Sequence, residues 1–354
     1  MKLIRLPGLI DTHVHLRDPG ETQKEDFLTG TTAALSGGVT TIFDMPNNLK
    51  PVFTLENLNE KISIAQKKAV CDWGLYFGSV GDNLDQFEKV LDKVVGLKIY
   101  LSLTTGKYVV ADEDKIKSIF TAWPKDKIIV FHAEGDRVDL ALKMCTQFKN
   151  KIHITHVNTA ESLSKIIQAK KDNLPVTCDV TPHHLFLTEG DRPRMGTVPN
   201  LYLVKPPLST KKDQDFLWQN LNWIDCFVSD HAPHLMSEKK SDNPPAGIPG
   251  LETMLPLFLT AVRNGRLSLN DLINKSSTNP RKIFGLKKDV TSFVDVDLDE
   301  KYTIENKNLK TKCVWSPYSG WKVSGRVKKV YLHNTLVFAD GKLLTSKGFG
   351  NRIN

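Results

Sequence analysis

The sequence lacks several features that would place it in a specialised class of protein. It has no apolar run near the roughly 18 residues that a membrane-spanning helix needs, and its N-terminus has no long apolar stretch typical of a signal peptide. Its five cysteines lie far apart and form no CxxC pair, so neither a disulfide framework nor a zinc ribbon is expected. These absences predict a soluble, cytoplasmic protein with reduced thiols.

Clustered positive charge is also missing, although the net charge is +8. Lysine pairs such as Lys67 with Lys68 and Lys239 with Lys240 are spread along the chain rather than gathered in one segment. Because nucleic-acid binding depends on clustered Lys and Arg side chains that neutralise phosphates, no nucleic-acid partner is expected. The excess of positive charge instead indicates a mild bias towards acidic substrates.

Short apolar segments alternate with longer amphipathic ones over most of the chain. Apolar residues recur at helical spacing in segments such as 55–69, 136–148 and 160–169. Eight strands that alternate with helices predict parallel pairing, and the fold that best satisfies this count is a closed (β/α)8 TIM barrel of the α/β class. The candidate strands are residues 9–15, 40–46, 72–78, 96–101, 127–132, 151–157, 175–180 and 225–230.

The pattern changes towards the C-terminus. From about residue 290 the sequence shows strand-like alternation, as in 323–330 and 336–339, followed by a turn at Asp340 and Gly341. We therefore expect a barrel over residues 1–289 and a small β-rich appendage, formed mainly by the C-terminal segment, over residues 290–354. Since the barrel pattern begins almost at Met1, the sequence leaves little room for an N-terminal strand in the appendage.

Polar side chains gather at the C-terminal ends of the candidate strands, the rim where barrel enzymes carry their active sites. His13 and His15 are two residues apart in one strand, so they project from the same face. The complete set is His13, His15, Lys98, His132, His156 and Asp230. Each residue alone has an ordinary structural interpretation, as a satisfied core histidine or, for Asp230, a helix N-cap. Their common position on one rim favours a metal centre.

Lys98 is the member of this set with the most specific chemistry. A protonated amine cannot coordinate a metal, and an unpaired ammonium buried in a strand is costly. If Lys98 reacts with carbon dioxide, its carbamate becomes an anionic ligand able to bridge two metal ions. Two such ions would hold a bridging hydroxide and polarise a substrate carbonyl, while Asp230 would transfer protons as general base and general acid.

These residues and the strings around them resemble the dihydroorotases of the amidohydrolase superfamily. The resemblance covers nearly the whole chain and is greatest to the dihydroorotase domain of the animal multifunctional pyrimidine-synthesis polypeptide. It implies a zinc-dependent hydrolase of pyrimidine biosynthesis that reversibly cyclises N-carbamoyl-L-aspartate to (S)-dihydroorotate. The strings are DTHVHLRDPG (11–20), DMPN (44–47), GLKIYL (96–101), HAE (132–134), ITHV (154–157), VTPHHL (180–185), SDHAPH (229–234) and PGLETMLPL (249–257).

The resemblance also implies roles for individual residues. One zinc ion would be held by His13, His15, carboxylated Lys98 and Asp230, and the other by carboxylated Lys98, His132 and His156. Substrate-binding positions are implied for Arg17, Asn47, Thr104, Thr105, Lys205 and His234. Arg17 suits this role because a guanidinium can hold the α-carboxylate of carbamoyl aspartate through paired, charge-assisted hydrogen bonds.

The chain departs from the animal domain at four positions. Thr155 and Asp179 stand where a cysteine and a glutamate have been associated with an additional metal, so a third metal is not expected. Lys205 replaces an expected arginine and loses its planar fork, and Thr105 replaces an aromatic residue of a loop that closes over substrate.

Two alternatives remain open. Another cyclic amidase, such as an allantoinase or hydantoinase, would share the metal ligands, although Arg17 argues against it. A non-catalytic scaffold derived from the barrel would have no reason to retain all six ligands. Family members are usually dimeric or larger, so a homo-oligomer is expected, either free-standing or fused to or associated with other pyrimidine-pathway enzymes, with a small-molecule substrate and no nucleic-acid or membrane partner.

Overall fold

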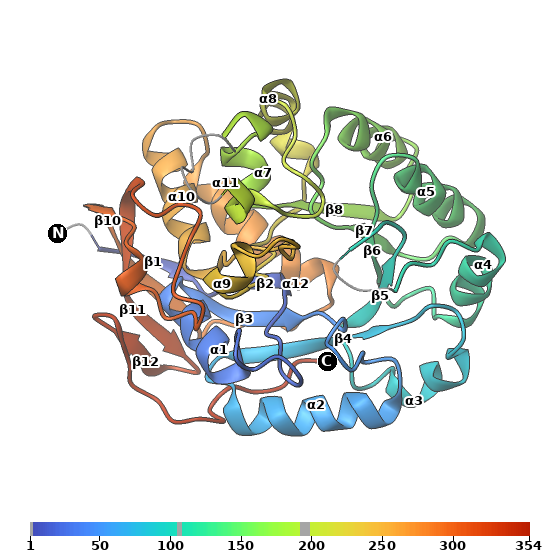
Figure 1. Cartoon of the computed structure of the whole chain (residues 1–354), viewed down its shortest axis with the longest axis horizontal. Coiled ribbons are helices and arrows are strands. Elements are labelled where there is room, and N and C mark those ends of the chain that lie inside the picture. Colours follow the sequence, from blue (N-terminus) through green and yellow to red (C-terminus); the bar gives the residue numbers. More distant parts are fainter. Residues whose placement is uncertain (1–2, 105–107, 192–198) are drawn as a thin grey trace.

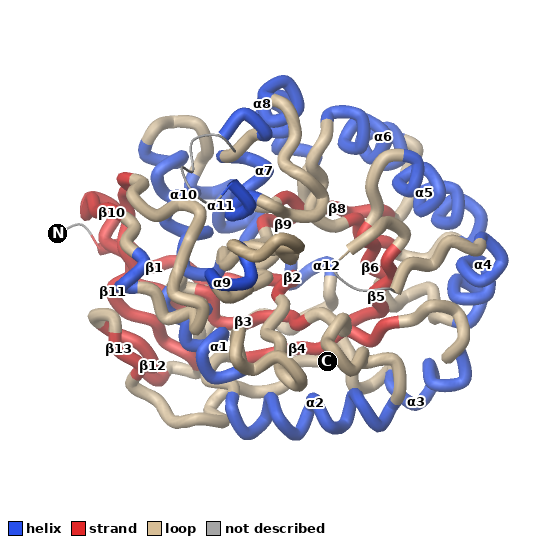
Figure 2. Tube along the Cα trace, in the orientation of Figure 1, coloured by secondary structure: helices blue, strands red, loops and turns tan. Residues whose placement is uncertain are grey.

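A parallel eight-stranded barrel forms the centre of the molecule, as the sequence predicts. The computed structural model describes residues 3–104, 108–191 and 199–354. The barrel strands pair in sequence order, and a parallel bridge between Val14 and His231 connects the first strand to the segment after the last (Figure 2). They are β2 (Leu9–Val14), β3 (Val39–Asp44), β4 (Asp72–Gly78), β5 (Gly96–Tyr100), β6 (Ile129–His132), β7 (Ile152–Ile154), β8 (Val176–Val180) and β9 (Cys226–Phe227).

Helices surround the barrel on its outer side (Figure 1). In α2 (Leu55–Lys68), the Thr54 side chain accepts a hydrogen bond from the Asn57 N–H and caps the first turn, while Leu58 and Ala65 face the core. The others are α1 (Phe27–Ser36), α3 (Phe87–Val90), α4 (Glu113–Ala122), α5 (Asp136–Phe148), α6 (Ala160–Lys171), α7 (Pro182–Phe186), α8 (Lys211–Gln219), α9 (Met236–Lys239), α10 (Leu251–Arg263), α11 (Leu269–Ile273) and α12 (Asn279–Ile283). None of the described helices is long and apolar enough to cross a membrane.

Two barrel strands end three residues earlier than the sequence predicts. Strand β7 stops at Ile154 and β9 at Phe227, whereas apolar segments extend to residues 157 and 230. His156 and Asp230 have φ angles of 42° and 45°, in the left-handed region that extended backbone cannot adopt. The left-handed turns therefore place these two side chains just beyond the strand ends, on the barrel rim.

A five-stranded antiparallel sheet lies beside the barrel and packs on α10 (Figure 1). Its strands, in spatial order, are β1 (Leu3–Pro7), β10 (Phe293–Thr303), β11 (Lys322–Leu332), β12 (Thr335–Ala339) and β13 (Lys342–Leu343). The C-terminal segment supplies most of this sheet, as expected. The expectation of little room for an N-terminal strand was wrong, because β1 pairs with β10 and its Leu6 lies buried opposite Val294. The division at residue 289 stays a prediction.

All five cysteines are buried and free, in keeping with the reduced thiols that the sequence predicts.

Candidate metal centre and substrate cavity

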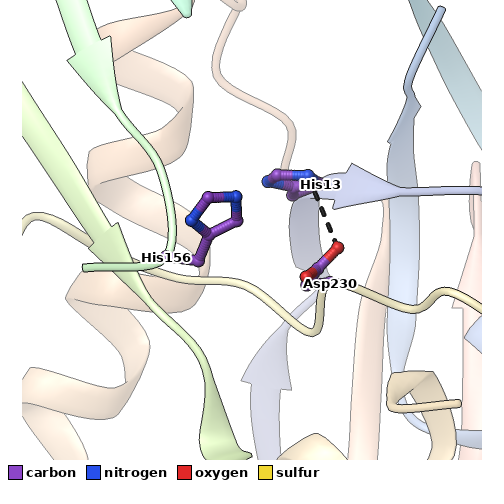
Figure 3. A group of neighbouring side chains, drawn as sticks. All are labelled: His13, His156 and Asp230. Carbon is purple, nitrogen blue, oxygen red and sulfur yellow. Dashed lines mark ion pairs between the residues drawn. The ribbon is translucent and has the colours of Figure 1, made fainter. Parts of the chain in front are cut away.

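The structure brings all six predicted ligands to one end of the barrel. His13, His132 and Lys98 lie in strands β2, β6 and β5, whereas the remaining three residues follow strand ends. The closest group is His13, His156 and Asp230, whose ligand atoms all lie within 4.8 Å of one another (Figure 3). Each of these three residues comes from a different strand of the barrel, so only the closed fold assembles the group.

His15 and His132 extend this group on two sides. The Asp230 Oδ1 lies 3.2 Å from the His15 Nε2 and 3.5 Å from the His13 Nε2. On the other side, the His132 Nδ1 lies 2.9 Å from the His156 Nε2. Four imidazoles and one carboxylate therefore surround a small volume, which is the donor chemistry that zinc prefers.

The protonation of the imidazoles also fits metal binding. Burial, together with the neighbouring Lys98, lowers the pKa of His13 well below its usual range. Burial and the adjacent His132 do the same to the pKa of His156. Within the described residues, the Nδ1 atoms of His13 and His156 are buried without a hydrogen-bond partner. Neutral imidazoles with unpartnered nitrogens are suited to coordinate a cation.

Lys98 lies in strand β5 and is fully buried. Its Nζ donates a hydrogen bond to the Thr155 Oγ1 at 3.3 Å, and in the described ranges no carboxylate lies within ion-pair distance. Burial lowers the pKa of Lys98 to about 7, although Asp179 and Asp230 act in the opposite direction. A neutral amine is the form that can react with carbon dioxide, so this environment fits the chemistry of a carbamate.

His13, His15, His132 and His156 line a cavity at this end of the barrel. Arg17 lines it and is only 6% exposed. The Arg17 Nε donates to the Pro233 carbonyl at 3.2 Å, and its Nη2 lies 3.0 Å from the His234 Nε2. Burial lowers the pKa of Arg17, but a guanidinium stays charged at neutral pH. No carboxylate pairs with Arg17 anywhere in the described part of the chain.

His234 contacts both Arg17 and the cavity wall. Its Nε2 lies 3.0 Å from the Arg17 Nη2 and 3.1 Å from the Ala246 carbonyl oxygen. A guanidinium can only donate and a carbonyl oxygen can only accept, so the tautomer of His234 decides which of the two is its hydrogen-bond partner. Burial, reinforced by the adjacent Arg17, lowers the pKa of His234 and favours the neutral imidazole.

The other predicted substrate residues have different surroundings. Thr104 and Lys205 line the cavity. The Asn47 Oδ1 lies 2.8 Å from the His15 Nδ1, so Asn47 orients a predicted metal ligand in this structure. Thr105 falls outside the residues that the structure describes.

Comparison with known proteins identifies the family. The profile of the amidohydrolase family matches residues 4–293. The chain belongs to the amidohydrolase family. Membership of this family implies a metal cofactor, in agreement with the histidine cluster.

Relatives with known names confirm the resemblance to dihydroorotases. The chain is 44% identical to the multifunctional protein CAD of Squalus acanthias over 352 residues, which are 99% of this chain and 16% of that protein. It is 38% identical to the dihydroorotase of Pyrococcus abyssi, covering 99% of this chain and 87% of that enzyme. The chain thus spans about a sixth of the multifunctional relative.

Solved structures show the same amidohydrolase barrel. The L-hydantoinase of Arthrobacter aurescens superposes with a TM-score of 0.92 at 26% identity, over 99% of this chain and 88% of that one. The inactive dihydroorotase-like domain of a CAD-like multifunctional protein from Chaetomium thermophilum superposes with a TM-score of 0.83 at 27% identity, over 100% of both chains.

Two acidic residues support this amidohydrolase site in roles that the sequence analysis did not predict. The Asp11 carboxylate accepts hydrogen bonds from the backbone N–H groups of His13 and Ser229, so it ties strand β2 to the segment that carries Asp230. Burial raises the pKa of Asp11 to about 7. Asp179 accepts a hydrogen bond from the backbone N–H of His156 and pairs with His153 Nε2 at 2.8 Å. A signal existed for Asp11, because it shares a strand face with His13.

Proposed function

We propose that this chain is a dihydroorotase, which interconverts N-carbamoyl-L-aspartate and (S)-dihydroorotate in pyrimidine biosynthesis. The observation that carries the proposal is Arg17, a buried cation that lines the cavity beside the histidines and has no carboxylate partner in the described residues. Both substrates bring a carboxylate that would complete this ion pair. The 38% identical dihydroorotase of Pyrococcus abyssi supports the same substrate.

The substrate would lie between the histidines and the outer wall of the cavity. Its α-carboxylate would accept paired hydrogen bonds from Arg17, which contacts His234. Lys205 and Thr104 line the same cavity and would bind the remaining polar groups. We also assign substrate contacts to Asn47 and Thr105.

The donor set fits two zinc ions. We assign His13, His15 and Asp230 to one ion, His132 and His156 to the other, and carboxylated Lys98 to both. Carboxylation joins the Lys98 amine to carbon dioxide with release of one proton, and places an anion among neutral imidazoles. When bound, the ions would polarise the substrate carbonyl and lower the pKa of a water molecule.

Asp230 is the proposed catalytic acid and base. It lines the cavity, is 8% exposed and lies beside both His13 and His15. In ring opening, Asp230 would accept a proton from the attacking water and deliver it to the ring nitrogen as the carbon–nitrogen bond breaks. In ring closure, the ureido nitrogen would attack the side-chain carboxyl group, and Asp230 would receive the nitrogen's proton. Asp230 would then pass this proton to the departing hydroxide, which leaves as water.

Two rival functions have specific support. The TM-score of 0.92 with an L-hydantoinase supports another cyclic amidase, such as a hydantoinase or allantoinase. The likeness to an inactive dihydroorotase-like domain supports a scaffold without catalysis. The six ligand positions and the unpaired Arg17 favour dihydroorotase over both rivals, because the first rival does not need Arg17 and the second does not need the ligands.

A substrate comparison separates the three functions. The full chain, reconstituted with zinc and bicarbonate, would be assayed with dihydroorotate, allantoin and hydantoin. We expect kcat/KM for dihydroorotate to exceed that for the other two by at least about a hundredfold, because only dihydroorotate has a carboxylate for Arg17. Preference for a neutral ring would favour the other amidases, and no turnover of any of the three would favour the scaffold.

Replacement of Arg17 by alanine tests the substrate assignment. The loss of charge-assisted hydrogen bonds, each of about 1.5–3 kcal/mol, should lower kcat/KM for dihydroorotate by roughly 10- to 150-fold per bond. Zinc content should not change, because Arg17 is not among the proposed ligands. The matched control is Arg5→Ala, which removes an exposed guanidinium paired with Asp295 and should leave kcat/KM as in the parent chain. An unchanged KM in Arg17→Ala would contradict the proposal that Arg17 binds the carboxylate of an anionic substrate.

The setting of the enzyme is part of the same proposal. We propose that it acts in the cytoplasm as a homo-oligomer, either alone or joined to other enzymes of the pathway. The second possibility is supported by the multifunctional relatives, of which this chain matches one part.

A further inference from the structure

Lys239, the last residue of α9, is a fully buried lysine that the proposed mechanism does not use. Its Nζ donates hydrogen bonds to the carbonyl oxygens of Leu203 at 3.2 Å, Pro245 at 2.9 Å and Gly247 at 3.1 Å. Burial lowers the pKa of Lys239 to about 8, so the ammonium is still mostly protonated at neutral pH and has three protons for three acceptors. In the described part of the chain it has no carboxylate partner.

The carbonyl oxygens that surround Lys239 belong to two segments of the cavity wall. Leu203 lies two residues before Lys205, and Pro245 and Gly247 flank Ala246; Lys205, Ala246 and Gly247 all line the cavity. The Gly247 N–H also donates to the Leu203 carbonyl at 2.9 Å. Lys239 thus joins two segments, more than 40 residues apart in the sequence, at one point behind the wall.

This wall packs tightly on the residues that hold Arg17. A Cβ on Gly247, which has φ of 134°, would lie 2.6 Å from the Ala232 carbonyl oxygen and 3.1 Å from the His234 Cδ2. From the other side, the Trp315 Nε1 donates to the His234 carbonyl at 2.7 Å. A shift of Gly247 would therefore move His234, and with it the guanidinium that His234 contacts.

A buried ammonium without a counter-ion is costly, and an apolar side chain of similar volume would avoid that cost. The three carbonyl oxygens offer a reason for its presence. A carbonyl oxygen carries partial negative charge and repels a carboxylate, so oxygens turned towards Lys239 are kept from facing a bound anion.

We propose that Lys239 is a positioning residue for anionic substrate: it gathers the carbonyl oxygens of Leu203, Pro245 and Gly247 behind the cavity wall and fixes Lys205, Gly247 and His234 for binding of the carboxylate. The inference deepens the proposed dihydroorotase function and rests on it. Because Lys239 acts on the wall and lies outside the proposed ligand set, its removal should affect substrate binding more than the chemical step.

The test is Lys239→Met, which keeps the length of the side chain and removes its charge and donors. We expect KM for dihydroorotate to rise at least about tenfold, kcat to change less than about threefold, and zinc content to stay the same. Hydrogen exchange at the Gly247 amide should accelerate, because its acceptor Leu203 is no longer held. The amide readout requires no turnover.

Lys275→Met is the matched control. Lys275 is also buried and donates to a backbone carbonyl, that of Ile224, but Ile224 precedes β9 at the opposite end of the barrel. Its replacement should leave KM and Gly247 exchange unchanged. If the methionine variant does not fold, a second variant, Lys239→Gln, serves instead. It retains two donors without the charge, so its KM should lie between that of the parent chain and the value expected for Lys239→Met.

The outcomes discriminate clearly. Parent-like KM and Gly247 exchange in a folded Lys239 variant would overturn the inference, as would an equal rise of KM in Lys275→Met. If the parent chain itself does not turn over dihydroorotate, the proposed function fails, and the exchange rate at Gly247 still decides whether Lys239 holds the wall.

Discussion

Replacement of Lys98 by alanine should abolish both turnover and stoichiometric zinc binding. In the proposed centre carboxylated Lys98 would hold both ions, so its loss would affect both sites at once. We expect kcat/KM for dihydroorotate to fall on the order of a thousandfold or more, which corresponds to about 4 kcal/mol of transition-state stabilisation. Steady-state kinetics and metal analysis of the reconstituted chain would measure the two effects.

Two controls distinguish a loss of the proposed metal ligand from a loss of folding. Lys98→Met fills the buried volume, and we expect its thermal stability to match that of the metal-free parent chain, since Lys98 has no carboxylate partner in the described residues. Added acetate should restore part of the activity of Lys98→Ala, because a small carboxylate can occupy the space left by the side chain and replace the carbamate. Full activity in either variant without added acetate would show that Lys98 is not a metal ligand.

Replacement of Asp230 by asparagine should lower kcat by roughly 10²- to 10⁴-fold, the usual contribution of a general acid or base. Asparagine keeps the shape of the side chain and one oxygen atom, but it cannot accept and return a proton. Binding of dihydroorotate should change little, because in the proposed complex Arg17 would hold the carboxylate. Single-turnover kinetics would give the chemical rate, and calorimetry would give the binding constant.

The Asp230 experiment also has an outcome that contradicts the mechanism. A kcat within about threefold of the parent chain, with zinc content unchanged, would mean that another group carries the proton. Asp225→Asn is a suitable control, because Asp225 precedes β9 and pairs with Lys170 at the other end of the barrel. It should not alter kcat.

The inactive relative shows why the function has to be argued from side chains. Its dihydroorotase-like domain superposes on the whole chain with a TM-score of 0.83, although its name describes it as inactive. A barrel of this kind is held together by its buried strands and helices, and those contacts persist when rim residues change. The fold therefore supports several activities or none. The proposed metal ligands and Arg17 are the residues that distinguish between these functions.

Much of the fold could be predicted because its signals are local. Strand β4 and helix α5 have the bounds 72–78 and 136–148 that the sequence predicts. Strand β1 could not be predicted in the same way. Its five residues acquire strand structure only by pairing with β10, which lies at the other end of the chain. The early ends of β7 and β9 depend on left-handed turns at His156 and Asp230, which apolar patterning does not reveal.

The sequence by itself determined the alternation of strands and helices and the residue types at the strand ends, because both follow from spacing over a few positions. Only the tertiary structure decided which groups meet. Asp11 reaches the Ser229 N–H across 218 positions, Trp315 reaches the His234 carbonyl across 81, and Lys239 collects carbonyls from two segments. The physical reason is that these contacts form when the barrel closes and its loops pack. No local sequence pattern indicates which distant residue a given side chain will contact.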